Sequence, residues 1–359
     1  MKSNMKGIST LATILLFATA ATASFWLMRH RSTPIDEQYA ALVTKKTLTI
    51  SGPVTAKVLS GGLSGMPIFL VTTDSTQYVV RFLSSKSPDE RNQEITGLRI
   101  ASQEGYGPHL YFVDPSQTYL IMEYVKSQPI SLEKRQSDEL YRALGNLLRK
   151  IHNGPSFSHE LNFFDDIQDE VQGLHAKNDG SIPLTKIESI ITRIRQAVTP
   201  YLTSVPSHGD LNPNNLLFEG NDFKAIDYEG VTQTDPYVDL ATVAIYYCFD
   251  DPLHENILLS TYLGRQPSSK EEAKLYLAKQ AIWIRYAAVL LYLTPEKSLH
   301  YESVRVQPYW EFLKEFYEDN INLEDPDQKQ ILAKAMINHV ITNAETQAFR
   351  DAVKTLGEV

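Results

Sequence analysis

The sequence is poor in cysteine and has no excess of positive charge. Its 359 residues include one cysteine, Cys248, and the formal net charge at pH 7 is −9. A single cysteine excludes an internal disulfide and any zinc site built from several cysteines. Cys248 lies in an apolar, aromatic run, which predicts a buried packing role. The absence of a basic stripe argues against general nucleic-acid binding, so we expect no nucleic-acid partner. Nothing in the sequence points to a protein partner.

Long apolar runs are also scarce, and one of them is at the N-terminus. Residues 8–28 are uncharged and mostly apolar, with Lys2 and Lys6 before them and Arg29 and Arg31 after them. These twenty-one residues could cross a bilayer as a helix. Residues 21–23 resemble a signal-peptide cleavage site, but the apolar run continues beyond them. We therefore expect residues 1–31 to form a hydrophobic membrane-anchoring helix; export after cleavage is the alternative.

The most informative stretch is at residues 208–229. Asp210 and Asn215 are separated by four residues, and Asp227 follows twelve residues later at the end of a short apolar run. This spacing is typical of a kinase catalytic loop followed by a metal-binding aspartate. We predict that Asp210 is the catalytic base, that Asn215 and Asp227 bind Mg²⁺, and that His208 is structural. Any one of these residues alone could simply cap a turn. The ordered set favours a phosphotransferase.

The first half of the chain is dominated by strand signals. Short apolar runs at residues 54–59, 68–72, 78–83, 110–113 and 119–124 predict a five-stranded sheet. The first two are joined by a glycine-rich turn. Glycine lets the backbone approach phosphates closely and offer its N–H groups to them. We therefore predict that this turn binds ATP through Ser60, Gly61, Gly62, Leu63 and Ser64.

Two further pairs of residues belong to the predicted nucleotide site. Arg81 is in the third strand, where kinases carry a phosphate-binding lysine. Glu94, in a predicted helix over residues 89–104, would pair with Arg81 and position it. A solvated glutamate on the helix face is the alternative for Glu94. Glu123 and Val125 lie where a hinge between two lobes would offer its backbone to adenine.

The rest of the sequence has helical periodicity. The main predicted helices are at residues 131–152, 184–198, 270–293, 306–320 and 327–345. His152, at the end of the first of them, is expected to be a packing or capping residue. Asp239, at the start of another helix, is expected to anchor the loop of residues 208–215 through backbone hydrogen bonds.

Together these motifs resemble the aminoglycoside phosphotransferase and choline kinase superfamily, over about residues 54–320. Arg81 in place of lysine, the turn at residues 60–64 and the run at residues 226–229 are most similar to choline and ethanolamine kinases. The resemblance implies an α+β, bilobal protein-kinase-like fold. Its N-terminal lobe, residues 47–125, would hold a five-stranded antiparallel sheet with one helix. Residues 126–359 would form a larger, mostly helical lobe, and residues 32–46 a linker after the N-terminal hydrophobic helix.

The resemblance also suggests an acceptor site. Choline kinases hold the quaternary ammonium with a Trp-x-x-Trp pair, and aromatic faces attract such cations. Trp283 and Tyr286 have the corresponding spacing here, and Tyr309 and Trp310 are further candidates, with Glu229 as a nearby carboxylate. Packing in the core is the alternative for these aromatics.

Two departures from the family pattern concern the acceptor rather than ATP. Gly230 follows Glu229 where an aromatic residue is common, and Tyr246 is at a position where glutamate is common.

These observations predict Mg²⁺- and ATP-dependent phosphorylation of an alcohol on a small, cationic substrate, with choline or ethanolamine first. A thiamine-type alcohol or an aminoglycoside is the alternative. Asp250, Asp251 and Glu255 could bind the several ammonium groups of an aminoglycoside, or could lie in an exposed loop. A membrane-tethered pseudokinase is the alternative of another class, although its base and metal ligands would be expected to be lost. ATP chemistry favours a cytoplasmic catalytic domain.

Overall fold

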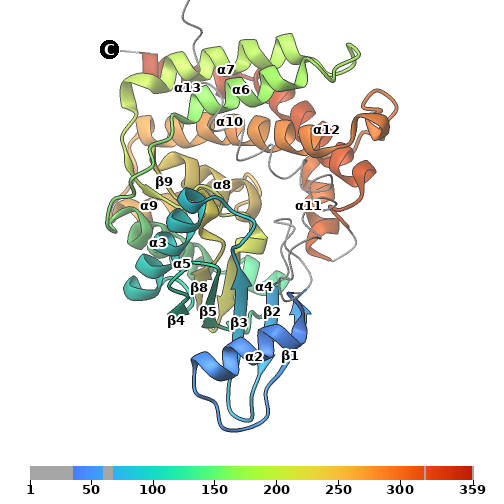
Figure 1. The fold of residues 1–359 in the computed structure, drawn as a ribbon. Coiled ribbons are helices and arrows are strands. Elements are labelled where there is room, and N and C mark those ends of the chain that lie inside the picture. The colour runs from blue at the N-terminus through green and yellow to red at the C-terminus, as the bar shows by residue number, and fades with distance from the viewer. Residues whose placement is uncertain (1–34, 60–67, 319–320, 358–359) are drawn as a thin grey trace, which may run out of the picture. The chain divides into compact units, whose positions relative to one another are not determined.

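The computed structural model describes residues 35–59, 68–318 and 321–357, which Figure 1 draws as ribbon. The chain divides into two compact units. Of the described residues, unit 1 contains those up to Ile130 together with Asn214–Val231. Unit 2 contains Ser131–Pro213 and Thr232–Val359. The predicted hydrophobic helix of residues 1–31 and the predicted ATP-binding turn of residues 60–64 lie outside the described residues.

Unit 1 is built on an antiparallel sheet in the order β1-β2-β3-β5-β4. Its strands are β1 (Thr55–Leu59), β2 (Ile68–Thr72), β3 (Gln77–Phe82), β4 (Leu110–Val113) and β5 (Tyr119–Glu123). The prediction of a five-stranded antiparallel sheet is confirmed. Arg81 of β3 lies in register with Ile68 of β2 and Leu120 of β5, so it occupies an interior strand of the sheet.

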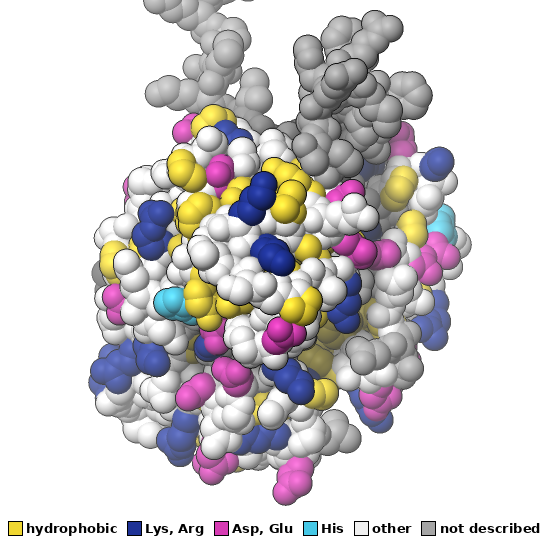
Figure 2. Space-filling view, turned by 60° about the horizontal axis from the view of Figure 1, so that its bottom comes forward, with side chains coloured by type: hydrophobic (Ala, Val, Ile, Leu, Met, Phe, Trp, Pro, Cys, Tyr) yellow, Lys and Arg dark blue, Asp and Glu magenta, His cyan; other side chains and the backbone are white. Residues whose placement is uncertain are grey.

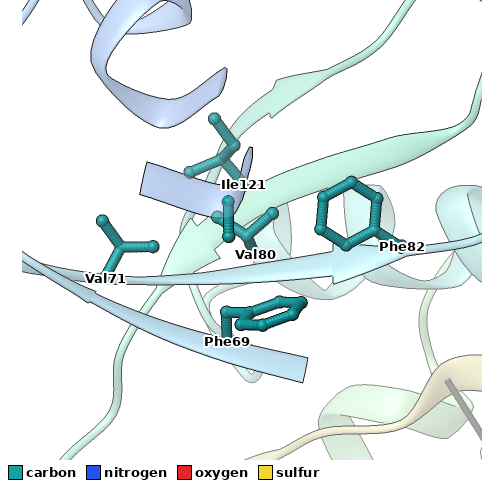
Figure 3. Close-up of a cluster of buried hydrophobic side chains, with 6 residues drawn as sticks. Phe69, Val71, Val80, Phe82 and Ile121 are labelled. Atoms are coloured by element: carbon teal, nitrogen blue, oxygen red, sulfur yellow. The ribbon is translucent and has the colours of Figure 1, made fainter. Parts of the chain in front are cut away.

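The core of unit 1 lies on one face of this sheet. Successive side chains of a strand point to opposite faces, so alternate residues of β2 and β3 share a face. Helix α2 (Glu37–Thr47) contributes Ala40 to the same cluster and occupies most of the segment predicted as a linker. Burial of each large apolar side chain contributes about 1.5–3 kcal/mol. Figure 3 shows the sheet residues of the cluster: Phe69, Val71, Val80, Phe82 and Ile121.

Helix α3 (Pro88–Glu104) and a small hairpin complete unit 1. Ser87 and Glu90 form a capping box at the start of α3, and Gly105 ends it with a left-handed φ of 75°. The hairpin consists of β7 (Leu216–Glu219) and β8 (Asp222–Ala225), and the short 3₁₀ helix η3 (Tyr228–Gly230) follows it. A Cβ atom on Gly97 of α3 would lie 2.9 Å from Cβ of Tyr228. Glycine is therefore needed for α3 to pack this closely on η3.

Unit 2 is mostly helical (Figure 1). Short strands β6 (Val205–Ser207) and β9 (Thr232–Thr234) pair antiparallel within it, and η1 (Thr199–Tyr201) and η4 (Glu296–Ser298) are single 3₁₀ turns. Another 3₁₀ turn, η2 (Pro213–Asn215), begins at the last residue of this segment of unit 2 and continues into unit 1. Its helices are α4 (Leu132–Arg135), α5 (Asp138–His152), α6 (Phe163–Leu174), α7 (Leu184–Val198), α8 (Tyr237–Tyr247), α9 (Pro252–Leu263), α10 (Ser269–Leu293), α11 (Tyr309–Tyr317), α12 (Pro326–Asn343) and α13 (Gln347–Gly357).

Helix α10 is the centre of unit 2. It packs against α6, α7, α8, α12 and α13. Its buried residues lie around most of its circumference, as expected of a helix inside a core. A capping box of Ser268 and Glu271 defines its start. Side chains that α10 presents to the rest of unit 2 are therefore held on a rigid element.

The helices of unit 2 differ from the predicted ones at two places. The helix predicted over residues 131–152 is two helices, α4 and α5, because the chain turns at residues 136–137. Ser137 donates its hydroxyl to the carbonyl of Lys134, a local hydrogen bond that competes with helix continuation. Helix α6 was not predicted, although Asn162 caps its start and its buried face has helical spacing. Cys248 is fully buried, as predicted.

The surface of the described part carries charges of both signs. Figure 2 shows Lys and Arg side chains interspersed with Asp and Glu on the face in view. In the part of the chain that the structure describes, every helix is too short or too polar to cross a membrane.

Candidate functional site

In unit 1, Arg81 is surrounded by three carboxylates. It forms ion pairs with Glu94 of α3 and with Glu229 of η3, and its Nη2 lies 3.3 Å from Oδ1 of Asp227. Lys86 adds a second cation, because its Nζ lies 2.6 Å from Oε2 of Glu94 and 2.8 Å from Oε1 of Glu229. The predicted ion pair between Arg81 and Glu94 is therefore present, within a larger network.

The charges of this network stabilise one another. Burial by itself would lower the pKa of Arg81, but the neighbouring carboxylates outweigh burial and raise the pKa above its ordinary value. Burial would likewise raise the pKa of Glu229, but Arg81 and Lys86 outweigh it and lower that pKa. Both groups are therefore charged at neutral pH. Lys86 carries no sequence signal of this role, since it lies in a turn without periodicity.

Asn215 and Asp227 flank the hairpin of β7 and β8. Asn215 is buried, and its backbone carbonyl accepts a hydrogen bond of 2.9 Å from the N–H of Ile226. This bond closes the base of the hairpin. One candidate metal ligand, Asn215, makes the bond, and the other, Asp227, is the next residue after its donor. Asp227 has a left-handed φ of 66°. A non-glycine residue in that region is uncommon and is frequently found at functional sites.

The residues present fit a hard divalent cation. Carboxylate oxygens of Glu94, Asp227 and Glu229 lie within 4.8 Å of one another. Mg²⁺ prefers oxygen ligands and binds commonly through one or two carboxylates. The Asp227 side chain is 36% exposed, whereas that of Glu94 is 4% exposed and engaged by Arg81 and Lys86. Asp227 is therefore the more accessible carboxylate of the group.

Gln93 is a member of this part of the site that sequence reasoning missed. Its side-chain amide donates to the carbonyl of Glu229 at 3.2 Å and to that of Val231 at 2.8 Å. Because Gln93 precedes Glu94 on α3, the helix that positions the ion-pair carboxylate also holds the backbone of η3. The close contact of Gly97 with Tyr228 is part of the same packing.

The predicted hinge residues also lie in unit 1. The carboxylate of Glu123 accepts hydrogen bonds from Nζ of Lys224 at 2.7 Å and from the N–H of His109 at 3.0 Å. Burial would raise the pKa of Glu123, but the Lys224 hydrogen bond and charge outweigh burial and lower it. Val125 is buried, and its carbonyl accepts from the N–H of Ser127 at 3.1 Å.

In unit 2, Asp239 holds the start of the candidate catalytic loop. Its fully buried carboxylate accepts from the N–H of His208 at 2.8 Å and from that of Gly209 at 2.9 Å. Nε2 of His152 lies 3.1 Å from the same carboxylate, and Nδ1 of His152 lies 3.0 Å from the hydroxyl of Tyr262. The buried His152 is thus held at both nitrogens. Burial would raise the pKa of Asp239, but the contacts with His152 and His208 lower it.

The backbone conformation of the loop requires glycine at Gly209, beside the candidate base. Its φ of 82° is in the left-handed region, where a side chain is disfavoured. This turn follows β6 directly and presents Asp210. The Asp210 carboxylate accepts, at Oδ1, a 2.7 Å hydrogen bond from the hydroxyl of Tyr286 and a 3.0 Å hydrogen bond from the amide of Asn212. Tyr286 therefore contacts the candidate base itself.

The other aromatic candidates form a cluster in unit 2. Trp283 is fully buried and Tyr309 is 2% exposed, whereas Trp310 is partly buried. The ring centroid of Trp283 lies 5.6 Å from that of Tyr309, 6.0 Å from that of Trp310 and 4.4 Å from that of His339. The hydroxyl of Tyr309 donates to the carbonyl of Ile245. This packing favours the core alternative for Trp283 and Tyr309.

The acidic residues considered for aminoglycoside binding have partners within unit 2. Asp250 and Glu255 both pair with Lys279, whose ammonium lies 5.6 Å from the ring centroid of Trp283. Asp251 caps α9 by accepting from the N–H of Leu253 at 2.9 Å. Asp250 and Glu255 already have a cation of the chain as their counter-ion.

Known structures share this fold. A choline/ethanolamine kinase family protein from Mesorhizobium loti matches with a TM-score of 0.63 and 18% identity, over 89% of this chain and 98% of that chain. Choline kinase LicA from Streptococcus pneumoniae matches with a TM-score of 0.53 and 18% identity, over 90% and 99%. Spectinomycin phosphotransferase APH(9)-Ia, in complex with ADP and spectinomycin, matches with a TM-score of 0.56 and 12% identity, over 85% and 99%.

The sequence itself identifies the family. None of the curated proteins matches the sequence of this chain. A family model described as "Phosphotransferase enzyme family" matches residues 55–275, which is more than half of the chain. The matched region includes Arg81, Asp210, Asn215 and Asp227. The chain therefore belongs to the phosphotransferase enzyme family.

Proposed function

We propose that the protein transfers the γ-phosphate of Mg²⁺-ATP to an alcohol of a small, cationic substrate, with choline or ethanolamine as the leading candidates. The observation that carries the proposal is the presence of Asp210, Asn215 and Asp227, in the order and spacing of a catalytic loop and its metal-binding aspartate, in a member of a phosphotransferase family. The hydrogen bonds that the backbone N–H groups of His208 and Gly209 donate to Asp239 support it, because a base must be held in place.

Each residue would have a separate task. Bound Mg²⁺-ATP would supply the phosphoryl group and neutralise its developing charge. Asn215 and Asp227 would hold the metal, and Arg81, positioned by Glu94, would bind the nucleotide phosphates. The turn of residues 60–64 would add backbone N–H groups, and residues 123–125 would contact adenine. Asp210 would accept the proton of the acceptor hydroxyl as the new P–O bond forms.

Three observations support a small cationic acceptor. The structural neighbours include proteins described as choline and ethanolamine kinases. The protein has a net charge of −9. The partly buried Trp310 is an aromatic candidate other than Tyr286 that is not fully enclosed, whereas Glu229 is already paired with Arg81 and Lys86. An aminoglycoside is the second candidate because APH(9)-Ia is also a neighbour, but the pairing of Asp250 and Glu255 with Lys279 weighs against it.

The test is an ATP-consumption screen of the full chain over choline, ethanolamine, thiamine and aminoglycosides. Asp210→Asn is expected to lower turnover on the accepted substrate by roughly 10²- to 10⁴-fold while nucleotide binding persists. Asp325→Asn is the matched control, because it makes the same change at a helix cap where asparagine serves equally well. Unchanged turnover in Asp210→Asn would contradict the proposed base.

The metal assignment has its own test. Asp227→Ala is expected to abolish Mg²⁺-dependent activity and to weaken Mg²⁺-dependent nucleotide binding, measured by titration calorimetry with and without Mg²⁺. Asp222→Ala, at an exposed position of the same hairpin, is the control. Equal Mg²⁺ dependence in Asp227→Ala and the wild type would remove Asp227 from the metal site.

We further propose that residues 1–31 anchor the protein in a membrane, with the catalytic part in the cytoplasm. The apolar run of residues 8–28 supports this proposal. Fractionation of cells expressing the full chain would place it with membranes, and the N-terminal sequence would begin before residue 21. Recovery of a chain starting near residue 24 would instead support export after cleavage.

A further inference from the structure

Tyr286 makes a contact that its expected role as a cation-binding ring does not need. Its hydroxyl lies 2.7 Å from Oδ1 of Asp210, although 75 residues separate the two in the sequence. The amide of Asn212 donates to the same oxygen at 3.0 Å. Two donors, one on the loop and one on α10, therefore meet at Oδ1 of the proposed base.

The hydroxyl of Tyr286 can act in this contact only as a donor. A carboxylate oxygen has no hydrogen to give, and burial together with the Asp210 charge raises the pKa of Tyr286 well above its ordinary value. The phenol therefore stays neutral. Hydrogen bonds to an ionised acceptor are roughly twice as strong as neutral ones, so this contact can fix the orientation of the carboxylate.

The packing around the ring of Tyr286 indicates that its hydroxyl is a fixed hydrogen-bond donor, rather than that its ring face is open to bind a cation. Tyr286 is on α10, which packs against five other helices of unit 2. The ring of Tyr246 from α8 meets it edge to face, with centroids 5.6 Å apart. Arg285, the residue before Tyr286, pairs with Glu170 of α6. A donor on a rigid, packed helix is suited to positioning a catalytic group.

We propose that Tyr286 is a positioning residue for Asp210: its hydroxyl donates to Oδ1 and fixes the orientation of the carboxylate that receives the proton of the acceptor alcohol. The inference rests on the proposed function. During transfer the acceptor oxygen forms a bond to the γ-phosphorus, the bond from that phosphorus to the β–γ bridging oxygen breaks, and ADP leaves. The hydroxyl proton passes to Asp210, and Tyr286 keeps its own proton throughout.

The substitution that separates the two roles is Tyr286→Phe, which removes the hydroxyl and keeps the ring. Loss of one hydrogen bond to a charged group predicts a fall in kcat of roughly 10- to 100-fold. The KM for the acceptor should remain within about twofold, since no group that binds the acceptor is lost. Tyr292→Phe, the same change on the same helix, is the matched control and should leave kcat unchanged.

A double-mutant cycle tests whether Tyr286 acts through the base. If it does, Tyr286→Phe should lower kcat in the wild type but have no further effect in Asp210→Asn. Equal effects in both backgrounds would mean that Tyr286 acts independently of Asp210 and would overturn the inference. A rise in the acceptor KM without a fall in kcat would also overturn it and would return Tyr286 to the role of a cation-binding ring.

Failure of this inference can be told apart from failure of the proposed function. If Asp210→Asn is inactive while Tyr286→Phe matches the wild type, the proposed function stands and the positioning role falls. If Asp210→Asn retains wild-type turnover, the proposed base itself is wrong. Thermal unfolding of each variant and nucleotide binding without acceptor show whether Tyr286→Phe is folded. An unfolded Phe variant would itself contradict a role confined to one hydrogen bond.

Discussion

Replacement of Asp239 by asparagine should weaken the hydrogen bonds that hold the loop that carries Asp210. The Asp239 carboxylate is fully buried and accepts from two consecutive backbone N–H groups, those of His208 and Gly209, one at each oxygen. Asparagine has almost the same shape but only one accepting oxygen. Its amide nitrogen would face one of these N–H groups, so that two donors would meet.

The size of the effect follows from these contacts. Loss of a hydrogen bond to a charged acceptor costs about 1.5–3 kcal/mol, and a buried N–H left without an acceptor costs about 1–3 kcal/mol. These terms overlap, because they describe the same bond, so Asp239→Asn should lower the free energy of unfolding by about 2–4 kcal/mol. For a unit of this size, about 2–4 °C per kcal/mol predicts a fall in Tm of roughly 4–16 °C.

The assay combines denaturant unfolding with hydrogen exchange at residues 208 and 209. The folded pKa of Asp239 is lowered, so its contribution to stability is present above the unfolded pKa and is lost as the pH falls through the folded pKa. Asp239→Asn should therefore lose most stability near neutral pH and least in acid. Asp251→Asn, at an exposed helix cap, should change little. Wild-type stability and unchanged exchange in Asp239→Asn would refute the reasoning.

Two further predictions concern packing and a buried charge. Gly97→Ala should destabilise unit 1 by about 1–3 kcal/mol and disturb η3, because its Cβ would lie 2.9 Å from Cβ of Tyr228; Gly357→Ala, with open space around it, should be neutral, and equal unfolding curves for the two would contradict the close packing. Burial raises the pKa of Glu170 to about 7 despite its pair with Arg285. The folded pKa exceeds the unfolded one, so ionisation of Glu170 costs stability as the pH rises through that range. Glu170→Gln should match the wild type near pH 5 and be more stable near pH 8, by up to ~3 kcal/mol; lower stability at pH 8 in denaturant unfolding would show that the pair with Arg285 outweighs burial.

Much of unit 1 could be predicted from local pattern. Short apolar runs separated by turn residues predicted all five strands, since this signal depends only on neighbours along the chain. The ion pair of Arg81 and Glu94 followed from their places in a strand and the next helix. The loop of residues 208–215 could be predicted as a candidate catalytic loop because phosphoryl transfer requires particular residue types at short, fixed spacing.

Contacts between segments distant in sequence could not be predicted in the same way. Helical spacing put Trp283 and Tyr286 on one face of α10, but did not reveal that Trp283 is enclosed while Tyr286 meets Asp210. Lys86 and Gln93 gave no signal because Glu229, a partner of both, is distant in sequence and lies in η3, after the hairpin of β7 and β8.

The sequence by itself determined the family, the five-stranded sheet and the chemistry available in the candidate catalytic loop, because these depend on residue type and on spacing along the chain. Only the tertiary structure decided which side chains form an ion pair, form a hydrogen bond or pack against one another. The network around Arg81 and the hydroxyl that holds Asp210 depend on how elements pack, and packing is a property of distant segments together. The physical reason is that burial and ion pairing act through space, whereas sequence patterns report only on neighbours along the chain.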